Sequence, residues 1–107
     1  MLPKLVRDKI PDIIRASGKN CEIDFVTGDD YIQALDAKLV EELAEYRESH
    51  SLEELADILE VIYALTHALG YKYRDLHATC CDKAHERGGF NHGIILKKIY
   101  EKENSDD

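Results

Sequence analysis

The chain has 107 residues and a formal net charge of −8, which suits a single domain and argues against a nucleic-acid backbone as its main partner. No run approaches the roughly 18 apolar residues of a membrane span, and no apolar segment of a secretory signal follows the charged N-terminus. Because the three cysteines, two of them adjacent, do not form a disulfide pattern, we expect a cytoplasmic protein.

The pattern along the chain predicts an all-α fold with one short helix and three long ones. The short helix begins at Pro11 and ends before Gly18, and a weakly alternating stretch over residues 21–26 is either a short strand or an extended link. The long helices are expected over residues 29–48, 51–69 and 73–87. We take residues 1–100 as one domain and the acidic residues 101–107 as a disordered tail.

Turn and capping residues separate the long helices. Ser51, with Glu54 three positions later, is a capping-box pattern that opens the middle helix, and Gly70 is suited to its C-terminal end. Gly88 and Gly89 end the last helix.

The helix over residues 29–48 carries carboxylates beside its apolar stripe. The stripe is formed at helical spacing by Leu35, Leu39, Leu43 and Tyr46. Glu42 and Glu45 flank it three residues apart, with Lys38 between them in angle, whereas Glu41 and Glu48 are expected to face solvent. Two neighbouring like charges repel each other and do not stabilise the helix unless they share a cation.

The helix over residues 51–69 repeats this arrangement with Glu54 and Asp57, again three residues apart. Its main apolar face comprises Leu52, Leu55, Ile58, Leu59, Ile62 and Leu69, and a second apolar side comprises Val61, Ala64 and Ala68. A helix that is apolar on most of its circumference must be covered on more than one side. We therefore expect a homodimer or a larger homo-oligomer, with a seam on the second side.

Joined by a short turn, the two helices can bring Glu42, Glu45, Glu54 and Asp57 together as a site for Mg²⁺ or Mn²⁺, because both ions prefer oxygen ligands. The alternative is a helical hairpin whose acidic side chains are merely solvated. Residues 20–60 carry a net charge of −11, between an N-terminal stretch of +3 and a neutral C-terminal part.

Two basic groups flank this acidic block. Lys83 and Arg87 share a face of the last helix with apolar residues, where they either meet an anion or simply interact with the helix end. At the N-terminus, Lys4, Arg7 and Lys9 form a second cationic group, which either binds phosphate or is an exposed basic leader.

Four segments together are similar to the small MazG-like, all-α nucleoside triphosphate pyrophosphohydrolases, some of which are labelled phosphoribosyl-ATP pyrophosphohydrolase. The segments are KLVRDKIPDII, KLVEELAEY, EELADILEVIYAL and KAHERGGF, in the expected order over nearly the whole chain. The resemblance implies Mg²⁺-dependent cleavage of a nucleoside triphosphate, or a phosphoribosyl nucleotide, to the monophosphate and pyrophosphate in nucleotide house-cleaning. It also implies an oligomeric helical scaffold.

The family's ExxE motif falls on Glu42 and Glu45, with Glu41 as an alternative register, and its ExxD motif falls on Glu54 and Asp57. The resemblance implies that these four carboxylates hold the metal. Glu42 or Glu45 is then the group that activates water, and the phosphates are held by five basic side chains, Arg7, Lys9, Lys38, Lys83 and Arg87.

Three other functions compete with this interpretation. A di-iron site is disfavoured because Glu-x-x-His is absent from the sequence. A zinc site can be drawn from His77, Cys81 and His85, but three ligands on one straight helix do not close a tetrahedron well. A non-catalytic helical module that binds a partner protein is the third.

Overall fold

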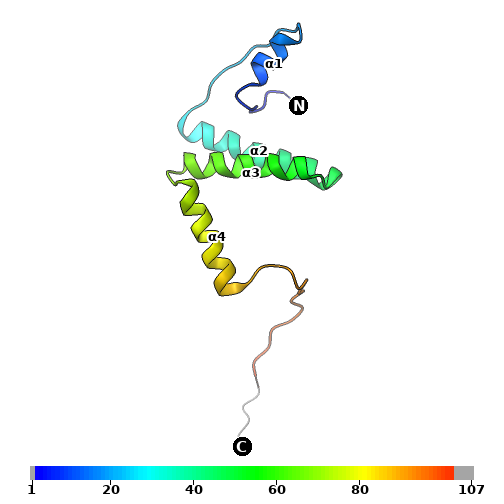
Figure 1. Ribbon diagram of the computed structural model, residues 1–107, viewed down its shortest axis with the longest axis vertical. Coiled ribbons are helices and arrows are strands. Elements are labelled where there is room, and N and C mark those ends of the chain that lie inside the picture. Colours follow the sequence, from blue (N-terminus) through cyan, green and yellow to red (C-terminus); the bar gives the residue numbers. More distant parts are fainter. Residues whose placement is uncertain (1, 103–107) are drawn as a thin grey trace, which may run out of the picture.

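The computed structural model describes residues 2–102, and within them it contains four helices and no strand (Figure 1). This confirms the all-α fold class. The helices are α1 (Ile10–Ala16), α2 (Gly28–Ser49), α3 (Leu52–Ala68) and α4 (Tyr73–Arg87). Residues 21–26 form an extended link and not a strand. In the part of the chain that is described, no helix combines the length and the apolar character needed to cross a membrane.

The ends of the helices follow the local signals in the sequence. The Ser51 hydroxyl accepts a hydrogen bond of 3.2 Å from the backbone N–H of Glu54 and so caps the start of α3. After α3, the N–H groups of Gly70 and Tyr71 donate to the carbonyls of His67 and Thr66, each at 3.0 Å. This is a Schellman motif, and it needs the left-handed conformation that Gly70 adopts with φ +92°.

The helices α2 and α3 form an antiparallel pair that is the centre of the molecule (Figure 1). The N-terminal segment and α1 lie along one side of this pair, and α4 leaves its end at a steep angle. The buried apolar core of the described residues consists of Leu35 on α2 and Val61 on α3, which are 3% and 8% exposed. A core this small leaves much apolar surface of the long helices uncovered.

The packing face of α2 is rotated from the predicted one. Leu43, expected in the apolar stripe, is 48% exposed, whereas Glu42 is only 5% exposed. The face that meets α3 is centred on Leu35 and Glu42, so the stripe of leucines lies partly outside it. Glu41, which was expected to face solvent, is half-buried because Lys4 of the N-terminal segment and Lys38 both contact it.

The two apolar sides of α3 also have roles that differ from the prediction. Leu55 and Leu59 on the expected main face are 45% and 44% exposed, so the described residues leave nearly half of the surface of each uncovered. Val61, which was expected at a seam between chains, is 8% exposed, and with Ala64 it lines a cavity closed by the N-terminal segment of the same chain. The prediction of a seam at Val61 is therefore wrong for this side of α3.

Beyond α4 the chain extends away from the helical pair without regular structure, and Phe90 is 98% exposed. The described part of the molecule measures 80 × 32 × 21 Å along its principal axes, an elongated shape for one small domain. Residues 103–107 of the predicted acidic tail lie outside the described residues.

Candidate metal centre

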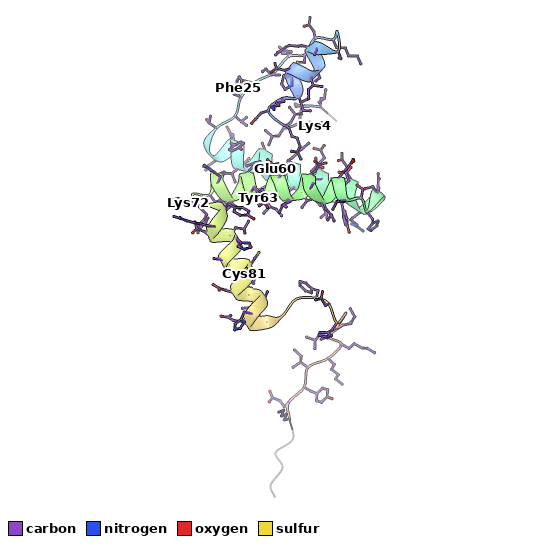
Figure 2. The ribbon with its side chains drawn as sticks, in the orientation of Figure 1. Lys4, Phe25, Glu60, Tyr63, Lys72 and Cys81 are labelled. Atoms are coloured by element: carbon purple, nitrogen blue, oxygen red, sulfur yellow. The ribbon has the colours of Figure 1, made fainter. Side chains whose placement is uncertain are left out.

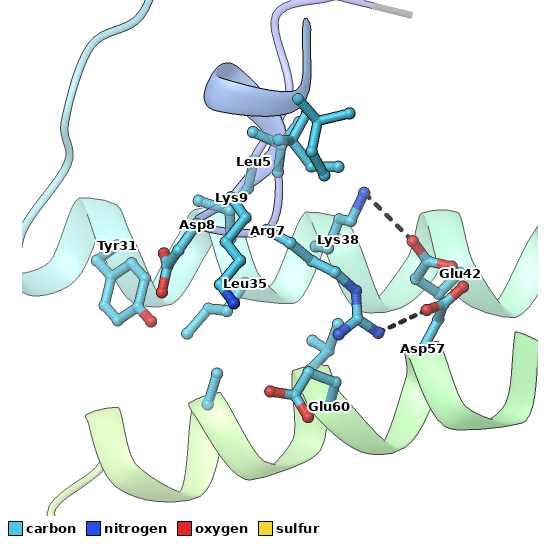
Figure 3. Close-up of a pocket in the computed structure, with 15 residues that line it drawn as sticks. Leu5, Arg7, Asp8, Lys9, Tyr31, Leu35, Lys38, Glu42, Asp57 and Glu60 are labelled. Carbon is cyan, nitrogen blue, oxygen red and sulfur yellow. Dashed lines mark hydrogen bonds and ion pairs between the residues drawn. The ribbon is translucent and has the colours of Figure 1, made fainter. Parts of the chain in front are cut away.

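Three segments meet at the acidic side of the helical pair: the N-terminal segment, the middle of α2 and the first half of α3. Figure 3 shows Glu42 of α2 beside Asp57 of α3, with Arg7 and Lys38 pointing toward them. The antiparallel turn between α2 and α3 sets this register. The meeting of Glu42 with α3 was predicted from the spacing of the acidic pairs, and the structure shows it.

One carboxylate oxygen from each of Glu42, Glu54 and Asp57 lies within 4.8 Å of the others. Glu45 shares a second group of the same dimensions with Glu41 and Glu42, so Glu42 belongs to both groups. Of the four predicted ligands, three form one cluster and Glu45 stands at its edge, exposed to solvent.

Two oxygens of this cluster, Oε2 of Glu42 and Oε2 of Glu54, are buried and have no hydrogen-bond partner in the part of the chain that the structure describes. Burial raises the pKa of Glu42, and the charges of Glu45 and Asp57 raise it further against the opposing effect of Lys38. Burial also raises the pKa of Glu54, assisted by repulsion from Glu45 and Asp57. Both carboxyl groups are therefore protonated more readily than an exposed glutamate, and a cation bound between them would oppose this.

The cations of the chain contact the outer side of the cluster. The Arg7 guanidinium donates a hydrogen bond of 2.6 Å from Nη2 to Oδ1 of Asp57, and this bond raises the pKa of Arg7. The Lys38 ammonium lies 3.2 Å from Oε1 of Glu42 and 3.3 Å from Oε1 of Glu41. Burial lowers the pKa of Lys38, but its contacts with Glu42 and Glu41 outweigh burial and raise it. Burial raises the pKa of Glu41, but Lys4 and Lys38 outweigh burial and lower it.

Lys4 was predicted only as a member of the N-terminal cationic group, whereas the structure places its ammonium 3.2 Å from Oε1 of Glu41. The contact joins positions 37 residues apart in the sequence. Its only signal was the basic character of the N-terminal stretch, which does not select one lysine over another.

A cavity of about 510 Å³ opens directly beside the carboxylates, between the N-terminal segment and the helical pair. Its lining includes Glu42 and Asp57, together with three of the five predicted phosphate-binding residues, Arg7, Lys9 and Lys38. Acidic ligands and basic side chains thus share one cavity wall, which is the combination that a metal-bound phosphate requires.

The other two predicted phosphate-binding residues, Lys83 and Arg87, lie on the last turns of α4. Figure 1 shows that α4 carries them away from the helical pair, and neither lines the cavity. On the same helix, Cys81 lies well away from Lys4 and Glu60 (Figure 2), and its Sγ is 3.7 Å from Nε2 of His77. Within residues 2–102, the groups whose geometry suits a metal contain carboxylates alone, so the His77–Cys81–His85 arrangement is not one of them.

The donor set fits a hard divalent cation. Three carboxylates supply oxygen atoms, which Mg²⁺ and Mn²⁺ prefer, and the buried Oε2 atoms of Glu42 and Glu54 have no hydrogen-bond partner within residues 2–102. A buried carboxylate oxygen without a partner is costly, and a cation removes that cost.

No family model and no solved structure matches the chain. An uncharacterized protein of Mycolicibacterium smegmatis is 54% identical to it over 46 residues, which make up 43% of this chain and 47% of that protein. The chain therefore spans about half the length of this curated relative. The similarity links the two sequences but carries no activity from one to the other.

Proposed function

We propose that the chain is a Mg²⁺-dependent nucleoside triphosphate pyrophosphohydrolase of the MazG-like type, which releases pyrophosphate and a nucleoside monophosphate. The observation that carries this proposal is the Glu42 carboxylate, 5% exposed, with one oxygen unpartnered among the acids of α3. The basic side chains of the same cavity supply the complementary charge for phosphates.

Glu42, Glu54 and Asp57 are the residues that would hold the metal. Bound there, Mg²⁺ would neutralise phosphate charge and make a coordinated water more acidic. Arg7, Lys9 and Lys38 would hold the phosphate oxygens along the cavity wall and stabilise the charge that develops on the departing pyrophosphate.

Glu45 is the better candidate for the base that activates water. It is exposed at the edge of the cluster, and its group with Glu42 keeps it next to the reacting centre. The oxygens of Glu42 would already be committed, Oε1 to Lys38 at 3.2 Å and Oε2 to the metal, which leaves Glu45 as the carboxylate available to the water. In this mechanism Glu45 accepts a proton from the water that attacks the α-phosphorus.

We also propose that the working unit is a homodimer or a larger oligomer. Leu43, Leu55 and Leu59 are each more than two-fifths exposed, and a second copy would cover them and complete a four-helix bundle. In this assembly Lys83 and Arg87 serve the site of another copy, because α4 carries them away from the carboxylates of their own chain.

Hydrolysis in ¹⁸O-labelled water tests the reaction. We expect a panel of nucleoside triphosphates with Mg²⁺ to yield pyrophosphate, with label in the monophosphate alone, because water attacks the α-phosphorus. Orthophosphate and a nucleoside diphosphate would show cleavage at the β–γ bond and would refute the proposal. Including phosphoribosyl-ATP in the panel separates house-cleaning from the alternative role in histidine biosynthesis, and no turnover of any substrate would favour a binding module.

A further inference from the structure

The cavity beside the carboxylates continues well past them along α2. It extends from Glu42 to Tyr31, and at about 1.5 Å per residue these positions are separated by roughly 16 Å along the helix axis. Figure 3 shows Tyr31 at the end of the cavity opposite Glu42 and Asp57, with Leu35 and Lys38 in between. A metal and the phosphates bound to it occupy only the acidic end.

The two ends of the cavity differ in chemistry. At the acidic end stand Glu42, Asp57, Arg7 and Lys38, all charged. The remaining walls are formed mainly by apolar residues of the N-terminal segment, α1, α2 and α3, which are Leu5, Val6, Ile10, Ile13, Leu35, Val61 and Ala64. Three charged residues, Asp8, Lys9 and Glu60, complete the lining, and Figure 3 shows Asp8 on the Tyr31 side. The aromatic ring of Tyr31 closes the far end (Figure 3).

We infer that the Tyr31 end of this cavity binds the nucleoside, with the base against Tyr31 and the 5′ side of the sugar directed toward Lys38. This inference rests on the proposed function for the direction of the phosphates. A nucleoside matches both ends, because its base offers flat apolar faces and its sugar leads to the charged group. An aromatic ring such as that of Tyr31 stacks on any base.

The dimensions agree with this ligand. About 510 Å³ lies within the range of roughly 300–1,000 Å³ that small-molecule pockets occupy. The separation of Tyr31 from Glu42 accommodates a base, a sugar and one phosphate placed end to end. The first phosphate then arrives at the carboxylates, which is where cleavage between the α- and β-phosphates requires it.

Binding of nucleoside 5′-monophosphates to the metal-free protein, measured by calorimetry and by amide chemical shifts, tests the inference. We expect at least one monophosphate to bind without Mg²⁺ and to shift the amides around Tyr31 and Ala64. Ala64→Leu fills the cavity wall and should weaken binding at least tenfold. The matched control is Ala56→Leu, the same change at an exposed position of the same helix, which should leave binding unchanged.

A second variant, on α2, distinguishes a loss of ligand contacts from a local change in packing around Ala64 on α3. Tyr31→Leu keeps an apolar side chain but removes the stacking ring, and we expect a loss of at least about fivefold, the lower end of the contribution of a base–aromatic stack. Circular dichroism and sedimentation should show that the variants keep the helical content and the assembly state of the wild type.

Two results would overturn the inference. In one, monophosphates bind equally well to the wild type, Ala64→Leu and Tyr31→Leu. In the other, triphosphates are hydrolysed but no monophosphate binds, so that the site holds phosphates alone. Conversely, monophosphate binding that both variants weaken, without hydrolysis of any triphosphate, would support the nucleoside pocket and refute the proposed reaction.

Discussion

Replacing Glu42 by glutamine is expected to abolish Mg²⁺ binding without unfolding the metal-free protein. The carboxylate is buried, with Oε1 near Lys38 and Oε2 unpartnered, so its charge is poorly compensated unless a cation is present. Glutamine keeps the size and one acceptor for Lys38 but removes the charge. The alternative is that the Lys38–Glu42 pair serves only to stabilise the fold.

The two roles predict different free energies of unfolding. Removing one partner of a purely structural buried pair typically costs about 3–5 kcal/mol. Here Lys38 would keep Glu41 as a partner at 3.3 Å, and the unpartnered Oε2 of the wild type already costs about 1–3 kcal/mol. We therefore expect Glu42→Gln to lower the stability of the metal-free protein by no more than about 1 kcal/mol.

Thermal unfolding followed by circular dichroism, with and without Mg²⁺, measures both quantities. At a free Mg²⁺ concentration 100 times the dissociation constant, the wild type should gain about 2.7 kcal/mol, a rise in Tm of roughly 10–20 °C for a domain of this size. Glu42→Gln should show no such rise, and the control Glu48→Gln, at an exposed position of the same helix, should retain it. An undiminished Mg²⁺ shift in Glu42→Gln, or a loss of 3–5 kcal/mol without metal (about the cost of a broken buried pair), would refute the reasoning.

Asp57→Asn should abolish pyrophosphate release with the helical content intact, and Glu45→Gln should lower kcat at least ~100-fold; similar losses in Glu48→Gln would show that the assignment of faces on α2 is wrong. Arg7→Gln should raise the affinity for Mg²⁺ in calorimetry without nucleotide, because Arg7 competes for Oδ1 of Asp57 at 2.6 Å; an unchanged affinity would contradict that competition. The pKa of Glu42 is raised above the ordinary 4.5, so protons compete with the metal at higher pH than usual. Mg²⁺ affinity should therefore fall as the pH is lowered through that raised value and be accompanied by proton release, whereas pH-independent binding would exclude Glu42 as a ligand.

The helix boundaries could be predicted closely because they depend on neighbouring residues. Ser51 and Glu54 are three positions apart, and Gly70 and Gly88 adopt backbone conformations that other residues avoid, so each signal is complete within a few positions. The acidic pairs on α2 and α3 could also be found, because their three-residue spacing and the short turn between the helices leave little freedom of register.

The rotation of α2 and the closure of the site depend on contacts that are distant in the sequence. The contact between Lys4 and Glu41 joins residues 37 positions apart, and that between Arg7 and Asp57 joins residues 50 apart. Hydrophobic periodicity places Leu43 inward because it counts only the helix itself. The packed N-terminal segment covers the acidic side instead, which brings Glu42 into the interior and leaves Leu43 nearly half exposed.

The same rotation changes where a second copy should bind. Val61 is covered within its own chain, whereas Leu43, Leu55 and Leu59 are among the apolar residues of α2 and α3 that remain exposed. Leu59→Lys tests this surface. In a two-fold symmetric contact each residue is used twice. Fully burying a leucine contributes about 1.5–3 kcal/mol, and a second copy can bury only the 44% of Leu59 that is exposed, which corresponds to about 0.7–1.3 kcal/mol. The dimer should therefore weaken by roughly 1.3–2.6 kcal/mol, about tenfold or more in Kd.

Sedimentation over a range of concentrations measures this change. Pyrophosphate release by the same samples should fall as the dimer dissociates, because Lys83 and Arg87 would then lose access to the other copy's site. Ala44→Lys, at an exposed position of α2, adds the same charge and should leave assembly intact. Leu59 is already 44% exposed, so its replacement leaves the contact between α2 and α3 largely undisturbed. A wild-type protein that sediments as a monomer at micromolar concentration while remaining fully active would show that one chain is sufficient, and the open leucines would then need another explanation.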